Sequence, residues 1–144
     1  MKIKEINDFQ MKEALELVWK VFLEFEAPDY TKEGIAEFKK TIDDKTWIEK
    51  RKFLGAFDDD KIVGVIATFE TSHIALLFVD GNYHRKGIGR KLFETVKKQN
   101  DKGFFTVNSS PYAHEVYKHF GFYDTDAEQE VKGLRFIPMR LELR

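Results

Sequence analysis

One short stretch of the chain, Ile74–Val79, reads Ile-Ala-Leu-Leu-Phe-Val and is apolar at every position. A strand with one face in water would alternate apolar and polar residues. A continuous apolar run is instead typical of a central strand that is covered on both faces. The run therefore predicts a sheet with helices packed on its faces.

The rest of the chain supplies the other elements of such a domain, in the order β-α-α-β-β-β-α-β-α-β. A helix capped at Asn7 or Asp8 extends toward Pro28, and Pro138 predicts an unpaired side or a bulge in the last strand. Asp58-Asp59-Asp60 separates the two strands of a hairpin. The expected strands are Ile3–Ile6, Phe53–Phe57, Ile62–Phe69, Ile74–Val79, Phe104–Asn108 and Leu134–Leu143, and the further helices are Thr31–Ile42, Gly87–Gln99 and Pro111–Phe120.

Composition limits the size and the chemistry of this domain. With 144 residues, 42% of them hydrophobic and 14 of them Phe, the chain is expected to form one domain, residues 1–144, with a full core. The absence of cysteine excludes a thiol nucleophile, disulfides and cysteinyl zinc sites. With 24 basic and 25 acidic residues the net charge is −1, so no nucleic-acid partner is expected.

No segment of the sequence predicts a membrane or a metal site. The N-terminal residues Met1–Glu5 lack the apolar run of a secretory signal, and no apolar stretch approaches the ~18–20 residues of a membrane helix. We therefore expect a cytoplasmic protein. His114 and His119 are five positions apart rather than the four of a zinc-protease helix, so no metal is expected. The oligomeric state stays open, a homodimer included.

The loop after the apolar strand combines glycines with basic residues. Residues 84–91 contain four basic side chains and no acid, and they lead into a predicted helix. Backbone N–H groups at a helix N-terminus bind phosphate, and glycine lets the backbone approach an anion closely. The spacing fits neither a dinucleotide fingerprint, in which Leu92 would be the third glycine, nor a Walker loop, in which Lys86 would be the second. The residues alone leave open a phosphate site or a tight turn with a solvated rim.

Two motifs resemble those of one family. Val79 followed by His84-x-x-Gly87-x-Gly89 is similar to the acetyl-CoA signature of GNAT-superfamily N-acetyltransferases. That signature is Gln/Arg-x-x-Gly-x-Gly/Ala, with a hydrophobic residue eight positions before the first glycine. Ala113-x-x-x-Tyr117-x-x-x-Gly121-Phe122 resembles the later motif of the same family. His84 departs from Gln/Arg, and Ser110 stands where an asparagine often occurs.

This resemblance implies a fold and a reaction. The fold is α/β (α+β), a mixed, mostly antiparallel central sheet flanked by helices. The reaction moves the acetyl group of acetyl-CoA to a primary amine of a small molecule or peptide, by direct attack in a ternary complex. Tyr117 would protonate the departing thiolate. The coenzyme-binding residues that the resemblance implies are Phe78, Val79, His84, Arg85, Lys86, Gly87, Ile88, Gly89, Arg90 and Ser110.

Several roles keep an alternative. Tyr117 shares a helical face with apolar residues and could be ordinary core, and Ser110 could simply cap a helix. No motif selects a general base among the candidates Glu24, Glu26, Glu70, Glu128 and Glu130. The acceptor pocket is expected from the first two helices and residues 124–133. The alternative functions are a non-catalytic acyl-CoA sensor or interaction module on the same fold, and an unrelated nucleotide-binding domain.

Overall fold

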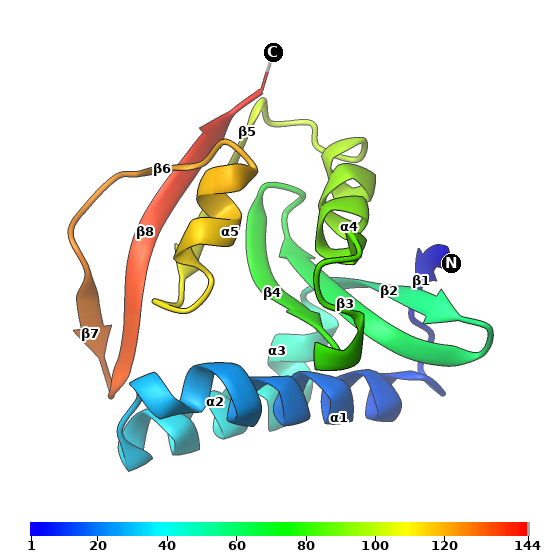
Figure 1. Ribbon diagram of the computed structural model, residues 1–144, viewed down its shortest axis with the longest axis horizontal. Helices are drawn as coiled ribbons and strands as arrows, with labels where there is room; N and C mark the ends of the chain where they lie inside the picture. Colours follow the sequence, from blue (N-terminus) through cyan, green and yellow to red (C-terminus); the bar gives the residue numbers. More distant parts are fainter. Residues whose placement is uncertain (144) are drawn as a thin grey trace.

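A central, mostly antiparallel sheet runs through the computed structural model, which describes residues 1–143 (Figure 1). Neighbouring strands follow the order β1-β2-β3-β4-β5-β8-β6, and β7 pairs with β8 outside that path. Only β4 and β5 are parallel neighbours among the described strands. The strands are β1 (Lys2–Glu5), β2 (Lys52–Asp58), β3 (Lys61–Phe69), β4 (His73–Val79), β5 (Phe104–Ser109), β6 (Tyr123–Asp124), β7 (Gln129–Val131) and β8 (Leu134–Glu142).

Helices cover both faces of the sheet. On one face α1 packs against β3 and β4, and α2 contacts β8; on the other, α4 packs against β2, β3 and β4. The α-helices are α1 (Met11–Val21), α2 (Lys32–Asp43), α3 (Lys45–Glu49), α4 (Ile88–Lys97) and α5 (His114–His119). Three shorter helical turns are η1 (Phe22–Glu26), η2 (Ala27–Asp29) and η3 (Gly81–Tyr83).

The sheet divides the apolar core into two clusters. Val65 and Ala67 of β3 belong to the cluster under α1 and α2, whereas Ile66 belongs to the cluster under α4 and α5. All three side chains are completely buried. The apolar strands of the middle of the chain are therefore covered on both faces, as the run Ile74–Val79 predicted.

The sheet opens between β4 and β5. These strands pair only at His73 with Thr106 and at Ile74 with Val107. Directly after this, Ala75 is an extra residue in β4, because Leu76 pairs with Ala67 of β3 while Ile74 pairs with Thr68. A bulge of this kind bends a strand. From Ala75 onward the backbone of β4 consequently has no strand partner on the β5 side.

The predicted order of elements is confirmed, and the differences are short elements. Asn7 caps the turn before α1, since its Oδ1 accepts from the Gln10 N–H at 3.0 Å. The helix predicted from Pro111 begins only at His114. The prediction missed α3, which Asp44 caps through the N–H groups of Thr46 and Trp47, and it missed the two short strands β6 and β7.

Pro138 has the predicted effect on the last strand. On one side β8 pairs continuously with β5 through this position. On the other side β7 pairs up to Phe136, and β6 begins pairing at Met139. Proline has no N–H to donate to a neighbouring strand. Pro138 thus lies where the two short partner strands β7 and β6 change over.

Candidate active site

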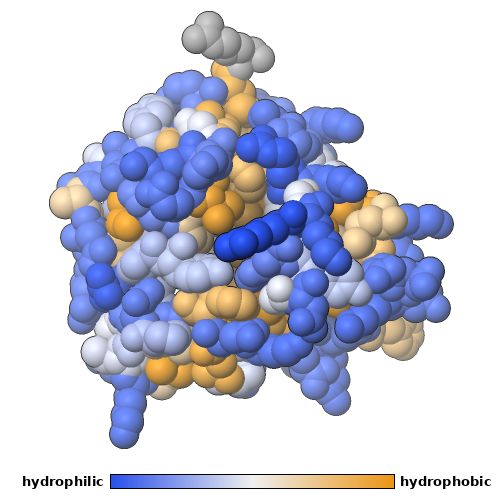
Figure 2. Space-filling view, viewed as in Figure 1, coloured by the Kyte–Doolittle hydropathy of each residue, from blue (hydrophilic) through white to orange (hydrophobic). Residues whose placement is uncertain are grey.

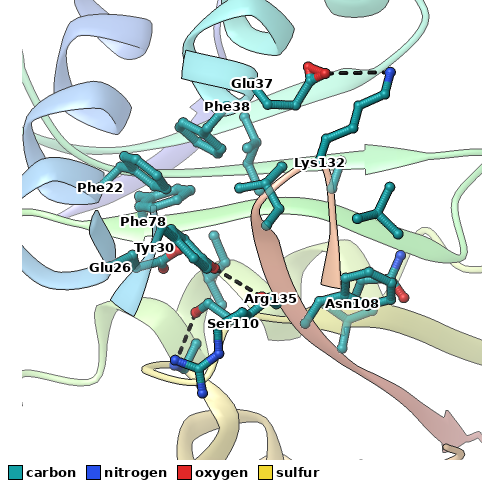
Figure 3. A pocket seen from close by; sticks show the side chains of 18 of the residues that line it. Phe22, Glu26, Tyr30, Glu37, Phe38, Phe78, Asn108, Ser110, Lys132 and Arg135 are labelled. Carbon is teal, nitrogen blue, oxygen red and sulfur yellow. Dashed lines mark hydrogen bonds and ion pairs between the residues drawn. The ribbon is translucent and has the colours of Figure 1, made fainter. Parts of the chain in front are cut away.

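A cavity of about 330 Å³ lies in the opening between β4 and β5 (Figure 3). In the space-filling view, hydrophilic side chains cover most of this side of the molecule, and apolar side chains show in its middle (Figure 2). The apolar lining comes from both halves of the sheet and from the N-terminal helices. The residues that line the cavity include Phe22, Glu26, Tyr30, Glu37, Phe38, Phe78, Ser110, Tyr117, Lys132 and Arg135.

At the end of β4 the chain presents a row of free backbone N–H groups. The N–H of His84 donates to the Gly81 carbonyl at 3.3 Å, and that of Lys91 donates to Gly87 at 3.0 Å. Within residues 1–143, none of the six N–H groups from Arg85 to Arg90 in between donates a hydrogen bond. The last three belong to the first turn of α4, where the helix dipole also favours an anion. Unpaired N–H groups and the positive end of the helix dipole thus lie together in this segment, an arrangement that favours an anion.

The backbone of this loop is held open by left-handed residues. Arg85 has φ +63° and Gly87 has φ +76°, and Gly87 caps the N-terminus of α4. A Cβ atom at Gly87 would meet nothing within 4 Å, and one at Gly89 would meet only Val79 at 3.9 Å. Packing against the rest of the chain therefore requires a glycine at neither position. The space around them remains available for a ligand.

The other side chains of the loop have separate roles. Ile88 is buried in the core beneath α4, and Arg85 and Lys86 are exposed. Arg90 donates to the His119 carbonyl at 3.1 Å and lies 5.1 Å from the centre of the Phe120 ring. The Arg90 side chain therefore connects α4 to α5. Only its backbone N–H belongs to the row of free N–H groups.

His84, which departs from the family motif, ties the loop to the end of β4. Its Nε2 lies 2.8 Å from the Val79 carbonyl oxygen. Its ring packs against Phe25 with ring centres 4.7 Å apart, and Phe25 in turn lies 5.4 Å from Tyr112. The side chain of His84 thus brings together the end of β4, η1 and, through Phe25, the turn before α5.

Tyr117 lines the cavity from α5. It is 5% exposed, and its ring packs edge-on against Phe120 and Phe122. Burial, with a smaller contribution from the charge of Glu26, raises the pKa of Tyr117 well above its ordinary value. The hydroxyl makes no hydrogen bond to any residue in 1–143. Tyr117 therefore belongs to the apolar core and also lines the cavity.

Five acids, all within the described residues, were candidates for the general base. Glu26 is the one of these five that lines the cavity. It ends η1, a π-helical turn in which the Ala27 N–H donates to the Phe22 carbonyl five residues back. Such a turn holds more residues than an α-helical one and changes the direction of the side chains that follow. Burial raises the pKa of Glu26 to about 7, with nearby Ser110 opposing the shift and Asp29 adding to it.

The remaining acids lie elsewhere. Glu128 pairs with Arg135 at 2.8 Å. Glu24 and Glu130 are exposed, and Glu70 stands in the turn between β3 and β4 with φ +52°. None of these four lines the cavity.

Ser110 both caps a turn and lines the cavity. Its Oγ accepts from the Ala113 N–H at 3.2 Å, so it caps the turn that leads into α5. It is 9% exposed and lines the cavity. The predicted capping role is confirmed, one turn before the helix proper begins.

Sequence reasoning missed two charged residues of the cavity. Glu37 of α2 and Lys132 of the β7–β8 turn form an ion pair at 3.6 Å. Neither residue belongs to a motif, and nothing in their sequence surroundings distinguishes them from solvated charges. They meet only because the hairpin folds back onto α2.

The described residues provide no group of three or more histidine or acidic side chains placed to hold a metal. His114 instead pairs with Asp124 at 2.7 Å, and His119 contacts the Glu115 carbonyl at 2.7 Å. Among residues 1–143 no helix is long and apolar enough to span a bilayer.

Comparison with known proteins connects this geometry to a family. Residues 26–143 match the family model described as "Acetyltransferase (GNAT) domain". No curated protein matches the sequence significantly. A GCN5-related N-acetyltransferase from Rhodopseudomonas palustris superposes with a TM-score of 0.86 at 18% identity, covering 99% of this chain and 95% of that one.

Two further similar structures contain coenzyme A. The PaiA N-acetyltransferase from Thermoplasma acidophilum, solved with coenzyme A, has a TM-score of 0.78 at 20% identity and 98% coverage of both chains. An aminoglycoside 6′-N-acetyltransferase, also complexed with coenzyme A, has a TM-score of 0.67 at 14% identity, covering 99% of this chain and 97% of that one. At these identities the structural likeness shows the fold.

Proposed function

The chain belongs to the GNAT acetyltransferase family and is an acyltransferase, and from this premise we propose that it transfers the acetyl group of acetyl-CoA to a primary amine by direct attack in a ternary complex. One observation carries the proposal. The opening between β4 and β5 ends at six free backbone N–H groups, and both Glu26 and Tyr117 line the same opening.

The coenzyme fits the two backbone features of the opening. The row from Arg85 to Arg90 would hold the pyrophosphate, because unpaired N–H groups at a helix N-terminus favour an anion. The unpartnered edge of β4, including Phe78 and Val79, would pair with the pantetheine arm as a further strand would. The two sites are continuous along the chain, so a single extended molecule can occupy both.

Glu26 is our candidate for the general base. The acceptor amine arrives as an ammonium ion and must lose a proton before its nitrogen can attack the thioester carbon. A carboxyl group with a pKa of about 7 can hold that proton near neutral pH and release it afterwards. An unshifted carboxylate would be a much weaker base. Glu26 thus has both the position and the proton affinity for the role.

Tyr117 is our candidate for assistance to the leaving group. As the new C–N bond forms and the C–S bond breaks, negative charge collects on the sulfur. Because burial raises the pKa of Tyr117, its hydroxyl stays protonated and is available as a donor. Its raised pKa also makes complete proton transfer less favourable than in an exposed tyrosine. We therefore expect the hydroxyl to stabilise the developing thiolate by a hydrogen bond while it keeps its own proton, and the thiolate to take its proton from solvent as the coenzyme leaves.

Acetylation assays with a panel of amines test the proposal. We expect acetyl-CoA consumption with at least one amine, and Tyr117→Phe should lower kcat by about 10²-fold or more while coenzyme binding stays unchanged. The Phe variant keeps the ring that packs against Phe120 and Phe122. Binding of acetyl-CoA without turnover of any amine would favour the sensor function. Thermal stabilisation by ATP or NAD but not by CoA would contradict both.

A further inference from the structure

A second carboxyl group lines the cavity, apart from Glu26 in the view of Figure 3. The Glu37 side chain is only 19% exposed, and its one ion-pair partner among the described residues is the Lys132 ammonium at 3.6 Å. Lys132 is itself 68% exposed, at a turn residue with φ +51°. The cavity therefore already holds, beside Glu37, an ammonium group on a flexible aliphatic stem.

An aromatic wall connects the two carboxyl groups. Phe38 follows Glu37 in α2 and stacks on Phe22 with ring centres 3.9 Å apart. Phe22 stacks on Tyr30 at 5.6 Å, and it begins the helical turn that Glu26 ends. Aromatic faces pack well against methylene groups and attract cations. A chain of methylene groups could follow this wall from one carboxyl group to the other.

The cavity offers no corresponding site for an anionic acceptor. Its basic residues within 1–143 are Lys132 and Arg135. The Arg135 guanidinium is bonded to Glu128 at 2.8 Å and donates to the Asp29 carbonyl at 3.2 Å. The ammonium of Lys132 is paired with Glu37. A carboxylate on the acceptor would have to displace Glu37, which is only 19% exposed, or Glu128, whereas a cation has to displace only Lys132, which is 68% exposed.

We propose that Glu37 selects the acceptor, and that the acceptor is an amine carrying a second cationic group on an aliphatic chain. The reacting amine would lie by Glu26 and the second cation by Glu37, where it takes the place of the Lys132 ammonium. This proposal rests on the acetyl transfer proposed above and adds the chemical class of its substrate. Lys132 would act as a competitor within the chain, leaving when such a substrate enters.

Three acceptors of matched length separate the possibilities. Diaminopentane, pentylamine and aminopentanoate each present a terminal primary amine, with a cationic, neutral or anionic far end. We expect kcat/KM to be highest for the diamine and lowest for the amino acid. A series of longer and shorter diamines then finds the best chain length. Equal use of diamine and pentylamine, or a preference for aminopentanoate, would overturn the proposal.

Substitutions at the ion pair test Glu37 itself. Glu37→Gln should raise KM for the diamine about 10-fold or more, since a charge-assisted hydrogen bond is lost, and leave KM for pentylamine unchanged. Lys132→Met keeps the stem without the charge and should lower KM for the diamine. Glu33→Gln, on an exposed position one turn earlier in α2, is the matched control and should change neither value. Equal effects of Glu37→Gln on both amines would exclude a specificity role.

Calorimetry separates failure of this proposal from failure of the proposed function. Diaminopentane is titrated into the protein saturated with CoA, which cannot react. Binding that is lost in Glu37→Gln supports the substrate class even if no turnover is observed with acetyl-CoA. Turnover of other amines without any diamine binding would support the proposed acetyl transfer and contradict the proposal that the acceptor is a diamine.

Discussion

At the residue scale, the two glycines of the loop between β4 and α4 differ in whether the backbone conformation requires them. Gly87 has φ +76°, a conformation that costs an L-residue about 1–2 kcal/mol. Gly89 has no such angle, and a Cβ there would make only an ordinary contact. The signature, which allows Gly or Ala at the second position, therefore combines one glycine that the backbone conformation requires with one that alanine can replace.

A pair of alanine variants tests this difference. Gly87→Ala should lower the free energy of unfolding by about 1 kcal/mol and weaken acetyl-CoA binding about 10-fold, because the N–H row loses its geometry. Gly89→Ala should change neither the free energy of unfolding nor the affinity for acetyl-CoA. Urea denaturation and calorimetry measure them. Equal loss of coenzyme affinity in the two variants would show that backbone conformation is not the cause.

Glu26 predicts the pH dependence of the reaction. Its carboxyl group must be ionised to accept a proton, so kcat/KM should rise with pH through about 7. Glu26→Gln should lower kcat/KM about 10²-fold and remove this rise. The matched control is Glu24→Gln, two residues earlier and exposed. A rise that persists in Glu26→Gln would assign the titration to another group.

The same carboxyl group should also make stability depend on pH. Its folded pKa is raised from 4.5 to about 7, so the folded state holds the proton more tightly than the unfolded state. The resulting stabilisation is complete below about 4.5 and is lost as the pH rises through about 7. Relative to Glu26→Gln, the parent protein should therefore lose about 2–3 kcal/mol between acid and neutral pH. Urea denaturation of both proteins across this range measures it.

At the element scale, the β7–β8 hairpin is docked on α2 by two glycines. A Cβ at Gly34 would collide with the Gly133 carbonyl oxygen, and one at Gly133 would lie 2.5 Å from the Gly34 nitrogen. The two backbones therefore touch without side chains between them. This contact holds Lys132 and the start of β8 against the cavity, on the side where we propose that the acceptor binds.

Separating these elements should affect the acceptor and not the coenzyme. Gly34→Ala should cost about 1–3 kcal/mol of stability through the collision and raise KM for the acceptor. The dissociation constant of acetyl-CoA should not change, because the N–H row lies on other elements. Ala36→Gly weakens the same helix by about 1 kcal/mol without touching the hairpin and is the control. Loss of coenzyme binding in Gly34→Ala would show a wider rearrangement.

At the scale of the whole molecule, one phenylalanine connects the two halves of the opened sheet. Strands β4 and β5 share only two residue pairs. Phe93 of α4 is completely buried and packs over the half of the sheet formed by β1–β4. The centre of its ring lies 5.2 Å from that of Phe105 in β5 and 5.6 Å from that of Phe122. Core packing therefore adds to the few hydrogen bonds that join the halves.

Removing this side chain tests that connection. Phe93→Ala should lower the free energy of unfolding by about 3–5 kcal/mol, as expected for a large buried aromatic. Phe9→Ala, at a position 99% exposed, should stay within about 0.5 kcal/mol of the parent. Circular dichroism during urea denaturation provides both values. Unfolding of the parent in two separate transitions would show that the halves are independent.

Local patterns in the sequence were sufficient for the long elements, and they located the loop that we propose as the phosphate site. Ile74–Val79 predicted a strand covered on both faces, and the glycines and basic residues after it indicated a phosphate site or a tight turn, because both features involve residues close together in the chain. The elements that were missed are short: α3 has five residues, and β6 and β7 are edge strands of two and three residues. So few residues carry no measurable periodicity.

The side of the site that we propose for the acceptor depended on tertiary structure. The sequence by itself determined an α/β domain, a loop that combines glycines with basic residues, and a set of five acids of equal standing. Only folding distinguished Glu26 from the other four, because its surroundings include Ser110 and Tyr117, which are distant from it in sequence. Glu37 and Lys132 likewise meet only when the hairpin reaches α2. Burial and charge pairing are properties of three-dimensional neighbours, and a sequence pattern records only neighbours along the chain.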